Sequence, residues 1–422
     1  MLSREKNELL TRTGPGTPCG EMMKRYWHPI ALAEELPAGG APVPVRAFGE
    51  DYVLFRDEQG RPGLLDIHCA HRGADLSYGR LEDGGLRCIY HGWLYDVNGR
   101  CLEQPGEPAG STFCEKIRQP AYPVIERADA LWAYFGPGEP PLFPKYEWLE
   151  LPTENVFALK LFHECNFQQG NEGNIDYLHL SFLHFNQGQD RGDEALAFNS
   201  RGAAPWRELV EGDRVPTGLR VCRIRQLEGK QHLYMGTYLM PSAFAFHNST
   251  TDGYSINWHV PIDDVTHWKF TFLFSRDHPL DKAAMRQGRN RVDERYHGVL
   301  NKSNRYGQDR STFDTTYSGI GTIFQAQDAC VTEGAGPIQD RTREHLGVSD
   351  VTVIEARELM FEAIKAVQEG QDPPHVLRRP EDNRFDWPIV WSGMVPDGTD
   401  WRAFFRAMDE QPQLQPLGSG AH

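Results

Sequence analysis

Cysteine and histidine occur in two short pairs near the start of the chain. Residues 69–71 read Cys-Ala-His and residues 88–91 read Cys-Ile-Tyr-His, with sixteen residues between His71 and Cys88. Zinc sites usually place two ligands of the same kind on each short arm, whereas each arm here carries one thiol and one imidazole. This mixed pairing suits a two-iron, two-sulfur cluster in which Cys69 and Cys88 hold one iron and His71 and His91 the other.

The residues that flank the two pairs also suit such a cluster. His-Arg-Gly-Ala follows at 71–74 and His-Gly-Trp-Leu-Tyr-Asp at 91–96, so that glycines let the backbone approach the sulfides and Trp93 and Tyr95 shield the centre. Histidine ligation raises the reduction potential above that of an all-cysteine cluster, which suits a centre that receives and passes on electrons. A zinc site, or two unrelated surface turns, remains the alternative. By itself this group indicates a Rieske-type electron-transfer module.

A second set of metal-binding residue types lies further along the chain. His179 and His184 are five residues apart, and Asp328 follows an apolar, strand-like run within 320–333. Two histidines and one carboxylate form the facial triad of non-haem iron(II) oxygenases. A regular helix turns roughly 500° over five residues, so the two imidazoles converge only if the helix is irregular or ends near His184. Asp176, three residues before His179 on the same predicted helix face, is the alternative carboxylate or a partner for the second ring nitrogen.

Composition limits the partners of such a chain. The 422 residues include 44 Lys and Arg against 59 Asp and Glu, a formal charge of −15, which disfavours nucleic acid and anionic membrane surfaces. No apolar stretch is long enough for a membrane span and the N-terminus is too polar for a secretory signal, so we expect a cytoplasmic protein. Eight cysteines are too sparse for a disulfide framework, and five are predicted to pack without a partner: Cys101, Cys114, Cys165, Cys222 and Cys330.

The elements that must position these residues fall into two regions of an α+β fold. Short apolar runs alternate with turn signals over 43–137 and predict an all-β module, which ends at the Pro- and Gly-rich stretch 136–144. Beyond it, alternating apolar patterns predict an antiparallel sheet, and 3.6-residue periodicity predicts helices that flank it, a helix-grip-like catalytic domain. The predicted strands are 219–227, 232–240, 254–261 and 267–275, and the predicted helices are 281–300 and 351–369.

The strands of the second region also predict a substrate pocket. Aromatic and other apolar side chains on or near them could close an apolar cavity with a few polar groups. The predicted lining is Met240, Phe244, Phe246, Trp258 and His259. A carboxylate substrate calls for a cation, and the sequence does not rank the arginines of this region, which are Arg207, Arg214, Arg220, Arg223 and Arg225.

Nearly the whole chain resembles the oxygenase (alpha) component of Rieske non-haem iron oxygenases, in the branch of phthalate 4,5-dioxygenase and aromatic O-demethylases. The segments that carry the resemblance are 13–29, 166–179, 260–264 and 336–347. The resemblance implies that Cys69, His71, Cys88 and His91 bind the cluster, that His179, His184 and Asp328 bind one mononuclear iron(II), and that Asp176 is the electron-transfer bridge between the cluster of one subunit and the iron of its neighbour. Gly173 departs from relatives that carry Asn there.

The resemblance also implies three domains and a set of partners. The domains are an N-terminal helical segment over 1–26 that packs on the catalytic domain, a Rieske domain over 27–140, and a catalytic domain over 141–422. The chain has no dinucleotide fingerprint, so electrons would come from NADH through a separate flavin and iron–sulfur reductase or a ferredoxin. A homotrimer or stacked trimers would hydroxylate or O-demethylate an aromatic substrate, such as an aromatic carboxylic acid, with O2. An electron-transfer protein without oxygenase activity and a zinc-binding structural protein are the alternatives.

Overall fold

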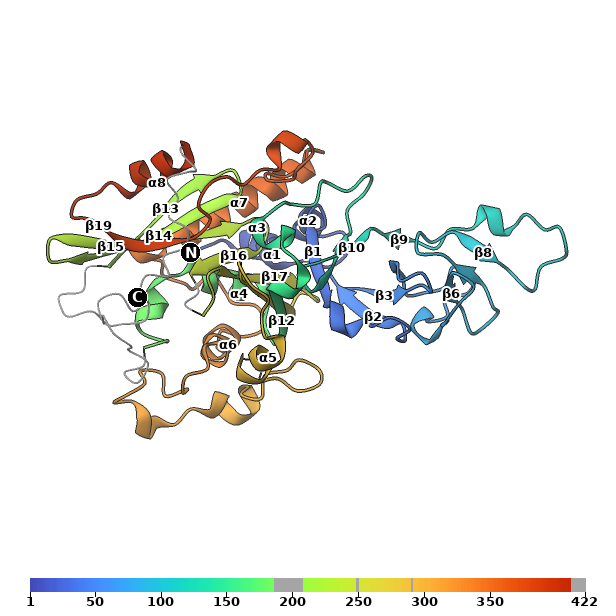
Figure 1. Cartoon of the computed structure of the whole chain (residues 1–422), viewed down its shortest axis with the longest axis horizontal. Helices are drawn as coiled ribbons and strands as arrows, with labels where there is room; N and C mark the ends of the chain where they lie inside the picture. The colour runs from blue at the N-terminus through green and yellow to red at the C-terminus, as the bar shows by residue number, and fades with distance from the viewer. Residues whose placement is uncertain (186–207, 248–249, 290, 411–422) are drawn as a thin grey trace.

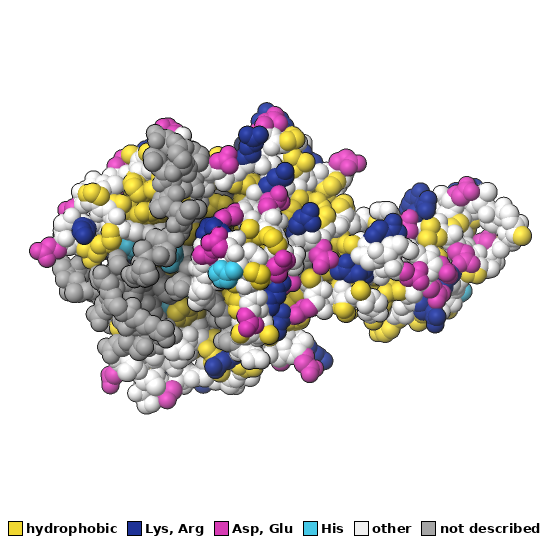
Figure 2. All heavy atoms as spheres, viewed as in Figure 1, with side chains coloured by type: hydrophobic (Ala, Val, Ile, Leu, Met, Phe, Trp, Pro, Cys, Tyr) yellow, Lys and Arg dark blue, Asp and Glu magenta, His cyan; other side chains and the backbone are white. Residues whose placement is uncertain are grey.

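The computed structural model describes residues 1–185, 208–247, 250–289 and 291–410. A broad body built on one large sheet carries a narrower lobe of small sheets, which projects from one side of it (Figure 1). This arrangement is the predicted α+β fold, with an all-β N-terminal module and an antiparallel sheet flanked by helices. Acidic and basic side chains are interspersed over the face of the body and the lobe seen in Figure 2.

The lobe contains two four-stranded antiparallel sheets. One has the order β2-β3-β4-β9 and the other the order β5-β6-β7-β8. The turn between β5 and β6 is the Asp83-Gly84 pair, both with positive φ, which is typical of a two-residue hairpin turn. The strands are β2 (Val43–Ala47), β3 (Glu50–Arg56), β4 (Pro62–Asp66), β9 (Ala121–Tyr122), β5 (Arg80–Glu82), β6 (Gly85–Arg87), β7 (Leu94–Tyr95) and β8 (Cys101–Glu103).

A three-stranded sheet of order β1-β11-β10 lies at the base of the lobe. It joins strands from both ends of the β-rich region: β1 (Trp27–Leu32), β11 (Ala130–Tyr134) and β10 (Val124–Arg127). Trp132 of β11 stacks on Phe272 and meets Trp258 edge to face, so aromatic packing ties this sheet to the large one. The helices that precede β1, α1 (Arg4–Thr11) and α2 (Pro18–Met23), pack against α7 (Val351–Gln368).

The large antiparallel sheet has the order β12-β18-β17-β16-β15-β14-β13, and β19 also pairs with β15. The four predicted strands are all present. Helices α4 (Phe167–Ile175) and α7 contact strands of this sheet, and strands such as β17 are buried along their whole length. The strands are β12 (Val156–His163), β13 (Glu208–Val215), β14 (Gly218–Leu227), β15 (Lys230–Leu239), β16 (Ala243–His247), β17 (Tyr254–Pro261), β18 (His267–Phe274) and β19 (Trp391–Pro396).

Of the two predicted helices, the structure confirms one and shortens the other. Helix α7 (Val351–Gln368) matches the predicted helix 351–369 to within one residue, and Gly370 with a φ of 76° follows its cap, Glu369. The predicted helix 281–300 is wrong beyond α5 (Lys282–Arg289), because residues 291–300 form bends and isolated bridges with Val292 paired to Gly298. The remaining helices are α3 (Glu147–Glu150), α6 (Phe324–Gly334) and α8 (Trp401–Glu410). No helix in the described ranges is long and apolar enough to cross a membrane.

Candidate metal centres

The two Cys/His segments form a pair of matching loops in the lobe. The Cys69 N–H donates to the carbonyl of the residue five positions on, and the N–H of Gly73 donates back to the Cys69 carbonyl. The second loop repeats the pattern: Cys88 donates to a carbonyl five residues on and accepts from Gly92 at 2.9 Å. Gly73 and Gly92 have φ values of 74° and 75°, a backbone region that glycine enters without strain. Each loop therefore presents its cysteine and histidine in the same way.

The donor set of these loops fits a two-iron, two-sulfur cluster. Both thiols are buried, and the rings of His71 and His91 lie 4.5 Å apart, centre to centre. The Nδ1 atom of His71 is buried without a hydrogen-bond partner among the described residues, which a metal bond would remedy. Trp93 stacks on the His71 ring at 4.4 Å. The Tyr95 hydroxyl lies 3.2 Å from the Cys69 sulfur.

The second centre depends on a break in the helix that precedes it. Helix α4 ends at Ile175, Asp176 is its C-terminal cap, and a separate 3-10 turn over Leu178–Ser181 carries His179. The prediction that Asp176 and His179 share one helix face is therefore wrong. In a regular helix, two histidines five residues apart would point in different directions. Because the helix breaks before His179, this limit does not apply to His179 and His184. Asp328 lies within α6, so the strand-like reading of the residues before it is also wrong.

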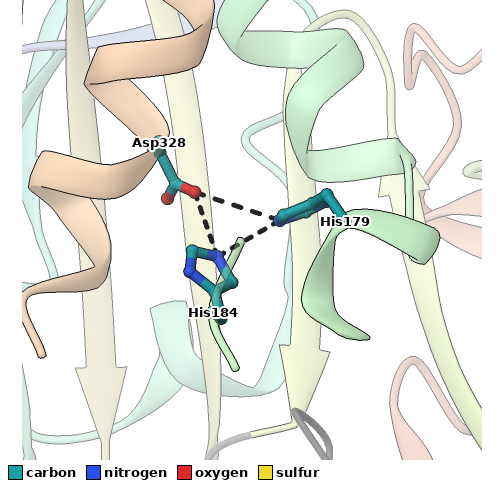
Figure 3. A group of neighbouring side chains, drawn as sticks. All are labelled: His179, His184 and Asp328. Atoms are coloured by element: carbon teal, nitrogen blue, oxygen red, sulfur yellow. Dashed lines mark hydrogen bonds and ion pairs between the residues drawn. The ribbon is translucent and has the colours of Figure 1, made fainter. Parts of the chain in front are cut away.

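The structure brings His179, His184 and Asp328 together at one point (Figure 3). The two Nε2 atoms are 3.2 Å apart, and Asp328 Oδ1 lies 3.0 Å from the Nε2 of His184 and 3.9 Å from that of His179. All three ligand atoms lie within 4.8 Å of one another. Two nitrogens and one carboxylate oxygen on one side of a common point match a facial triad.

Hydrogen bonds at the far side of each ring fix which nitrogen faces that point. His179 Nδ1 donates to the Asp176 carbonyl at 2.5 Å, because a carbonyl can only accept. His184 Nδ1 donates to Gln327 Oε1 at 2.6 Å, and the Gln327 amide is oriented by its own bond to the Gly321 carbonyl at 2.7 Å. In neutral rings both Nε2 atoms then carry lone pairs. Two lone pairs and a carboxylate face one another, an arrangement that a cation stabilises.

The charges around the triad also suit a cation. Burial alone would raise the pKa of Asp328, but the attraction of His184 in its protonated form, and then of Lys269, lowers that pKa well below its usual value. Lys269 Nζ, on β18, lies 3.5 Å from Asp328 Oδ2. Burial, and then the charge of His184, lowers the pKa of His179. The carboxylate is thus ionised and the imidazole of His179 neutral at pH 7, which are the forms that bind a metal.

Asp176 lies beside this centre and is not one of the three converging residues. Its carbonyl accepts the His179 Nδ1 proton, while its carboxylate accepts from the Leu178 N–H at 2.8 Å. The carboxylate Oδ2 lies 3.9 Å from His179 Nδ1 and the side chain is 34% exposed. The carboxylate is therefore accessible from outside while its own backbone orients a triad histidine.

A cavity of about 370 Å³ opens beside the triad. Of the predicted lining residues only Phe246 contributes to it. Apolar and polar side chains both line it, and the polar ones include Asn174, Ser255, Asn257, Lys269, Thr271 and Gln325. The other four predicted residues do not line it. Trp258 alternates with Asn257 on β17 and points to the opposite side, into the core. Met240 and Phe244 are buried in the core of the body, where the Tyr177 ring covers Phe244, and His259 lies behind Asn174.

The cations of the cavity are Lys269 and Arg291, neither of which the sequence singled out. The arginines considered from the sequence serve elsewhere. Arg214 pairs with Glu355 and Glu362 on the surface, Arg220 with Asp409, and Arg225 with Glu208, while Arg223 is buried below the ring of Tyr234. Arg207 lies outside the described residues.

The two centres together define a class of protein that couples an electron-carrying iron–sulfur lobe to an oxygen-activating type of metal site. Residues 26–123 match the Rieske [2Fe-2S] domain and residues 133–419 match the LigXa C-terminal domain like family. The chain belongs to the Rieske oxygenases, in the branch of phthalate dioxygenase and dehydrodivanillate O-demethylase oxygenase subunits. It is accordingly an oxidoreductase of the kind that incorporates molecular oxygen.

Similar proteins cover nearly the full chain. The phthalate 4,5-dioxygenase oxygenase subunit of Pseudomonas putida is 35% identical over 421 residues, 96% of this chain and 95% of that protein. The 5,5'-dehydrodivanillate O-demethylase oxygenase subunit of a Sphingobium species is 32% identical over 94% of this chain and 89% of its own length. Among solved structures, the terminal oxygenase of carbazole 1,9a-dioxygenase from Novosphingobium sp. KA1 is similar with a TM-score of 0.58 and 19% identity, over 88% of this chain and 99% of that one.

The sequence did not predict the roles of three residues at the second centre. Gln327 orients His184, Lys269 pairs with Asp328, and Asn174 lines the cavity. Gln327 precedes Asp328 directly, and a glutamine next to a predicted ligand is the one sequence signal that could have suggested it. Lys269 gave no such signal, since it lies on a strand 59 residues from its partner.

Proposed function

We propose that this chain is the terminal oxygenase component of a multicomponent system that hydroxylates or O-demethylates an aromatic carboxylic acid. One observation carries the proposal: the convergence of His179, His184 and Asp328 beside a cavity, in the same chain as a Rieske domain. An electron carrier would not need the triad, and a structural zinc site would not leave one side of its metal open to a cavity. In this proposal the Rieske domain spans 27–140, the catalytic domain 141–422, and residues 1–26 pack on the latter.

The triad residues would hold one iron(II), and Cys69, His71, Cys88 and His91 the Rieske cluster. When bound, these groups supply electrons and an open coordination face at which dioxygen reacts with the substrate. The residues of the chain contribute orientation. The Asp176 carbonyl and Gln327 direct both Nε2 atoms of the triad inward. Lys269 compensates part of the Asp328 charge and keeps that carboxylate in place.

The shape and charge of the cavity support an aromatic acid as the substrate. Its volume of about 370 Å³ is at the lower end of small-molecule sites and fits one substituted ring. Tyr177, Tyr234 and Phe246 provide flat apolar surface, and Lys269 and Arg291 provide positive charge for a carboxylate. The similar proteins named for phthalate and dehydrodivanillate favour the same chemical class.

The proposal includes partners outside the chain. We propose that NADH supplies electrons through a separate flavin and iron–sulfur reductase or a ferredoxin, and the structurally similar carbazole 1,9a-dioxygenase oxygenase has been solved in complex with a ferredoxin. That complex has a TM-score of 0.55 and 18% identity, over 89% of this chain and 98% of that one. We further propose a homotrimer, alone or stacked, in which Asp176 is the electron-transfer bridge to the cluster of a neighbouring subunit. The accessible carboxylate of Asp176 supports this role.

The experiment that tests the proposal counts iron and turnover in matched variants. Purified protein should contain about three irons per chain and show Rieske-type visible absorption, and His179→Ala should retain the cluster and lose one iron. With NADH and a reductase, wild-type protein should consume O2 with a methoxylated or carboxylated aromatic acid. Asp176→Asn should keep all three irons and lose turnover. Zinc in place of iron, or three irons with no O2 consumption across such a panel, would refute the proposal.

A further inference from the structure

A chain of hydrogen bonds runs from the cavity wall into the body of the protein. Thr271 Oγ1 donates to Asn257 Oδ1 at 2.7 Å, and Asn257 Nδ2 donates to Asn174 Oδ1 at 2.9 Å. Asn174 Nδ2 contacts His259 Nε2, and His259 Nδ1 lies 2.9 Å from His267 Nε2. The first three residues line the cavity. The two histidines lie behind them and are fully buried.

The last bond of this chain fixes the direction of all the others. His267 Nδ1 lies 2.7 Å from the Cys165 carbonyl, which can only accept, so this nitrogen carries the proton. In the neutral ring His267 Nε2 is then an acceptor, and His259 must donate from Nδ1 and accept at Nε2. Burial lowers the pKa of both imidazoles well below the usual value, which keeps them neutral. The amide of Asn174 therefore has to turn its NH2 group toward His259.

This orientation leaves donors on the cavity wall. Each asparagine NH2 group has two hydrogens, and the bonds described use one of them in Asn174 and one in Asn257. Both Oδ1 atoms already accept a hydrogen bond from within the chain. Asn174 and Asn257 both line the cavity, so each brings to it one N–H group that the bonds described leave unused, and Lys269 brings its ammonium group to the same lining.

We propose that Asn174 and Asn257 form a subsite for a carboxylate oxygen of the substrate, and that His259 and His267 are positioning residues that keep both amides in the donor orientation. This inference rests on the proposed function for the class of substrate and deepens it by naming the groups that recognise it. An amide free to flip could offer either its oxygen or its nitrogen, whereas the buried histidine pair removes that choice. Ligands that carry a donor at the same place, such as an ammonium group, would be rejected.

Close packing of the helix supports the role of the histidine pair. A Cβ atom at Gly170, on α4, would lie 2.5 Å from His259 Nδ1 and 2.8 Å from His267 Nε2. The helix that carries Asn174 therefore approaches both rings as closely as only glycine permits. One turn later this helix presents Asn174 to His259, so the distance between the amide and the imidazole is set by backbone packing.

The test measures binding of two ligands of one shape by isothermal titration calorimetry, using anaerobic protein loaded with iron and cluster. The ligands are 3-methoxybenzoate and 3-methylanisole, in which a methyl group replaces the carboxylate. Wild-type protein should bind the benzoate at least tenfold more tightly. Asn257→Leu should raise the Kd for the benzoate about tenfold, the value of one hydrogen bond to a charged group, and change that for 3-methylanisole less than about twofold. Asn257→Asp, of the same size, should weaken benzoate binding at least as much.

Two variants of His259 separate positioning from a structural role. In His259→Gln the side-chain oxygen can accept from Asn174 in place of Nε2, so the preference for the benzoate should survive within about twofold. His259→Leu removes the acceptor and should reduce the preference about fivefold or more, with binding of 3-methylanisole unchanged. Equal loss of both ligands in His259→Leu, or equal preference in the glutamine and leucine variants, would overturn the positioning role.

The outcome for wild-type protein decides the subsite itself. Binding of 3-methoxybenzoate no tighter than that of 3-methylanisole would overturn the carboxylate subsite, even if the protein consumes O2 with another substrate. Conversely, a clear preference that Asn257→Leu abolishes would support the subsite even if no product forms with any aromatic acid. Failure of the proposed function and failure of this inference are therefore distinguishable.

Discussion

Replacing Glu172 by Gln tests how helix α4 is held in place behind the cavity. Both carboxylate oxygens of Glu172 are bound: Arg341 donates to Oε1 at 3.1 Å and to Oε2 at 3.0 Å, and Arg357 donates to them at 2.8 and 2.9 Å. All three side chains are at least nine-tenths buried. Arg357 also pairs with Glu344, whereas Arg341 has no second carboxylate among the described residues. Glu172→Gln therefore leaves a buried guanidinium without a counter-charge.

The pKa of Glu172 gives the magnitude. Burial alone would raise it, but the attraction of Arg341 and Arg357 lowers it from the usual 4.5 to about 2. The difference between the pKa of Glu172 in the folded protein and the usual value for glutamate corresponds to about 3 kcal/mol of folding stability at neutral pH. Because the folded-state pKa is the lower one, this contribution is fully present above pH 4.5 and is lost as the pH falls toward 2. Removing one partner of a buried pair typically costs about 3–5 kcal/mol, which agrees with this figure.

The assay is urea unfolding followed by far-ultraviolet circular dichroism at several pH values. At pH 7, Glu172→Gln should lower the free energy of unfolding by about 3 kcal/mol, and the difference from wild type should shrink as the pH is lowered from 5 to 3. Glu362→Gln is the matched control, since its partner Arg214 and the glutamate itself are about half exposed, and it should cost less than about 1 kcal/mol. A loss below 1 kcal/mol in Glu172→Gln, or a difference that stays constant down to pH 3, would refute the reasoning.

Three further predictions concern the sites. Gln327→Leu removes the acceptor that orients His184 and should weaken binding of the mononuclear iron about 10- to 100-fold in an iron titration of metal-depleted protein, with the Rieske spectrum unchanged; unaltered affinity would count against this role. Gly170→Ala should cost about 1–3 kcal/mol and lower the Tm, since the added methyl group meets two buried imidazoles, and an unchanged Tm would contradict the packing. The sulfurs of Cys101 and Cys114 lie 2.7 Å apart, so treatment with hydrogen peroxide should join them in a disulfide, the peroxide taking up both thiol hydrogens to yield water. The intact mass of the wild-type protein should fall by two hydrogens, and that of Cys114→Ser should not.

The sequence could predict both candidate metal sites because their residue types are rare and their chemistry restrictive. Mixed Cys/His arms narrow the choice of cluster, and two histidines with a carboxylate narrow the choice of metal site. The predicted strands also agree with the structure, since period-two alternation is a local property. What the sequence could not predict was the break after Ile175, because no proline or glycine follows α4 directly; Asp176 caps it through its backbone N–H, bonded to the Glu172 carbonyl.

Contacts between distant residues account for the remaining errors. Phe244 and Phe246 lie on the same side of β16, but the Tyr177 ring covers Phe244, so only Phe246 reaches the cavity. This contact joins residues 67 positions apart in the chain, and the strand pattern alone does not predict it. Cys101 and Cys114 were expected to pack without a partner, and yet β8 and the turn that follows it bring their sulfurs together. Thirteen residues of separation match no ligand or disulfide rule, so spacing alone could not reveal this contact.

Two histidine pairs lie next to α4, His179 with His184 and His259 with His267, and the same kind of hydrogen bond orients a ring in each pair. His179 donates from Nδ1 to a backbone carbonyl, and so does His267, which in each case leaves Nε2 as an acceptor. What faces that lone pair then decides the chemistry. Near His179 it meets a second imidazole and the carboxylate of Asp328, a set that only a cation satisfies. Behind the cavity wall, the Nε2 lone pair of His267 accepts the Nδ1 proton of His259. The Nε2 atom of His259 in turn faces the amide of Asn174. These lone pairs are therefore satisfied by N–H groups of the protein, and the two histidines orient the amides that line the cavity. The carboxylate that faces the imidazoles, more than the number of histidines, therefore distinguishes the candidate metal centre from the buried pair.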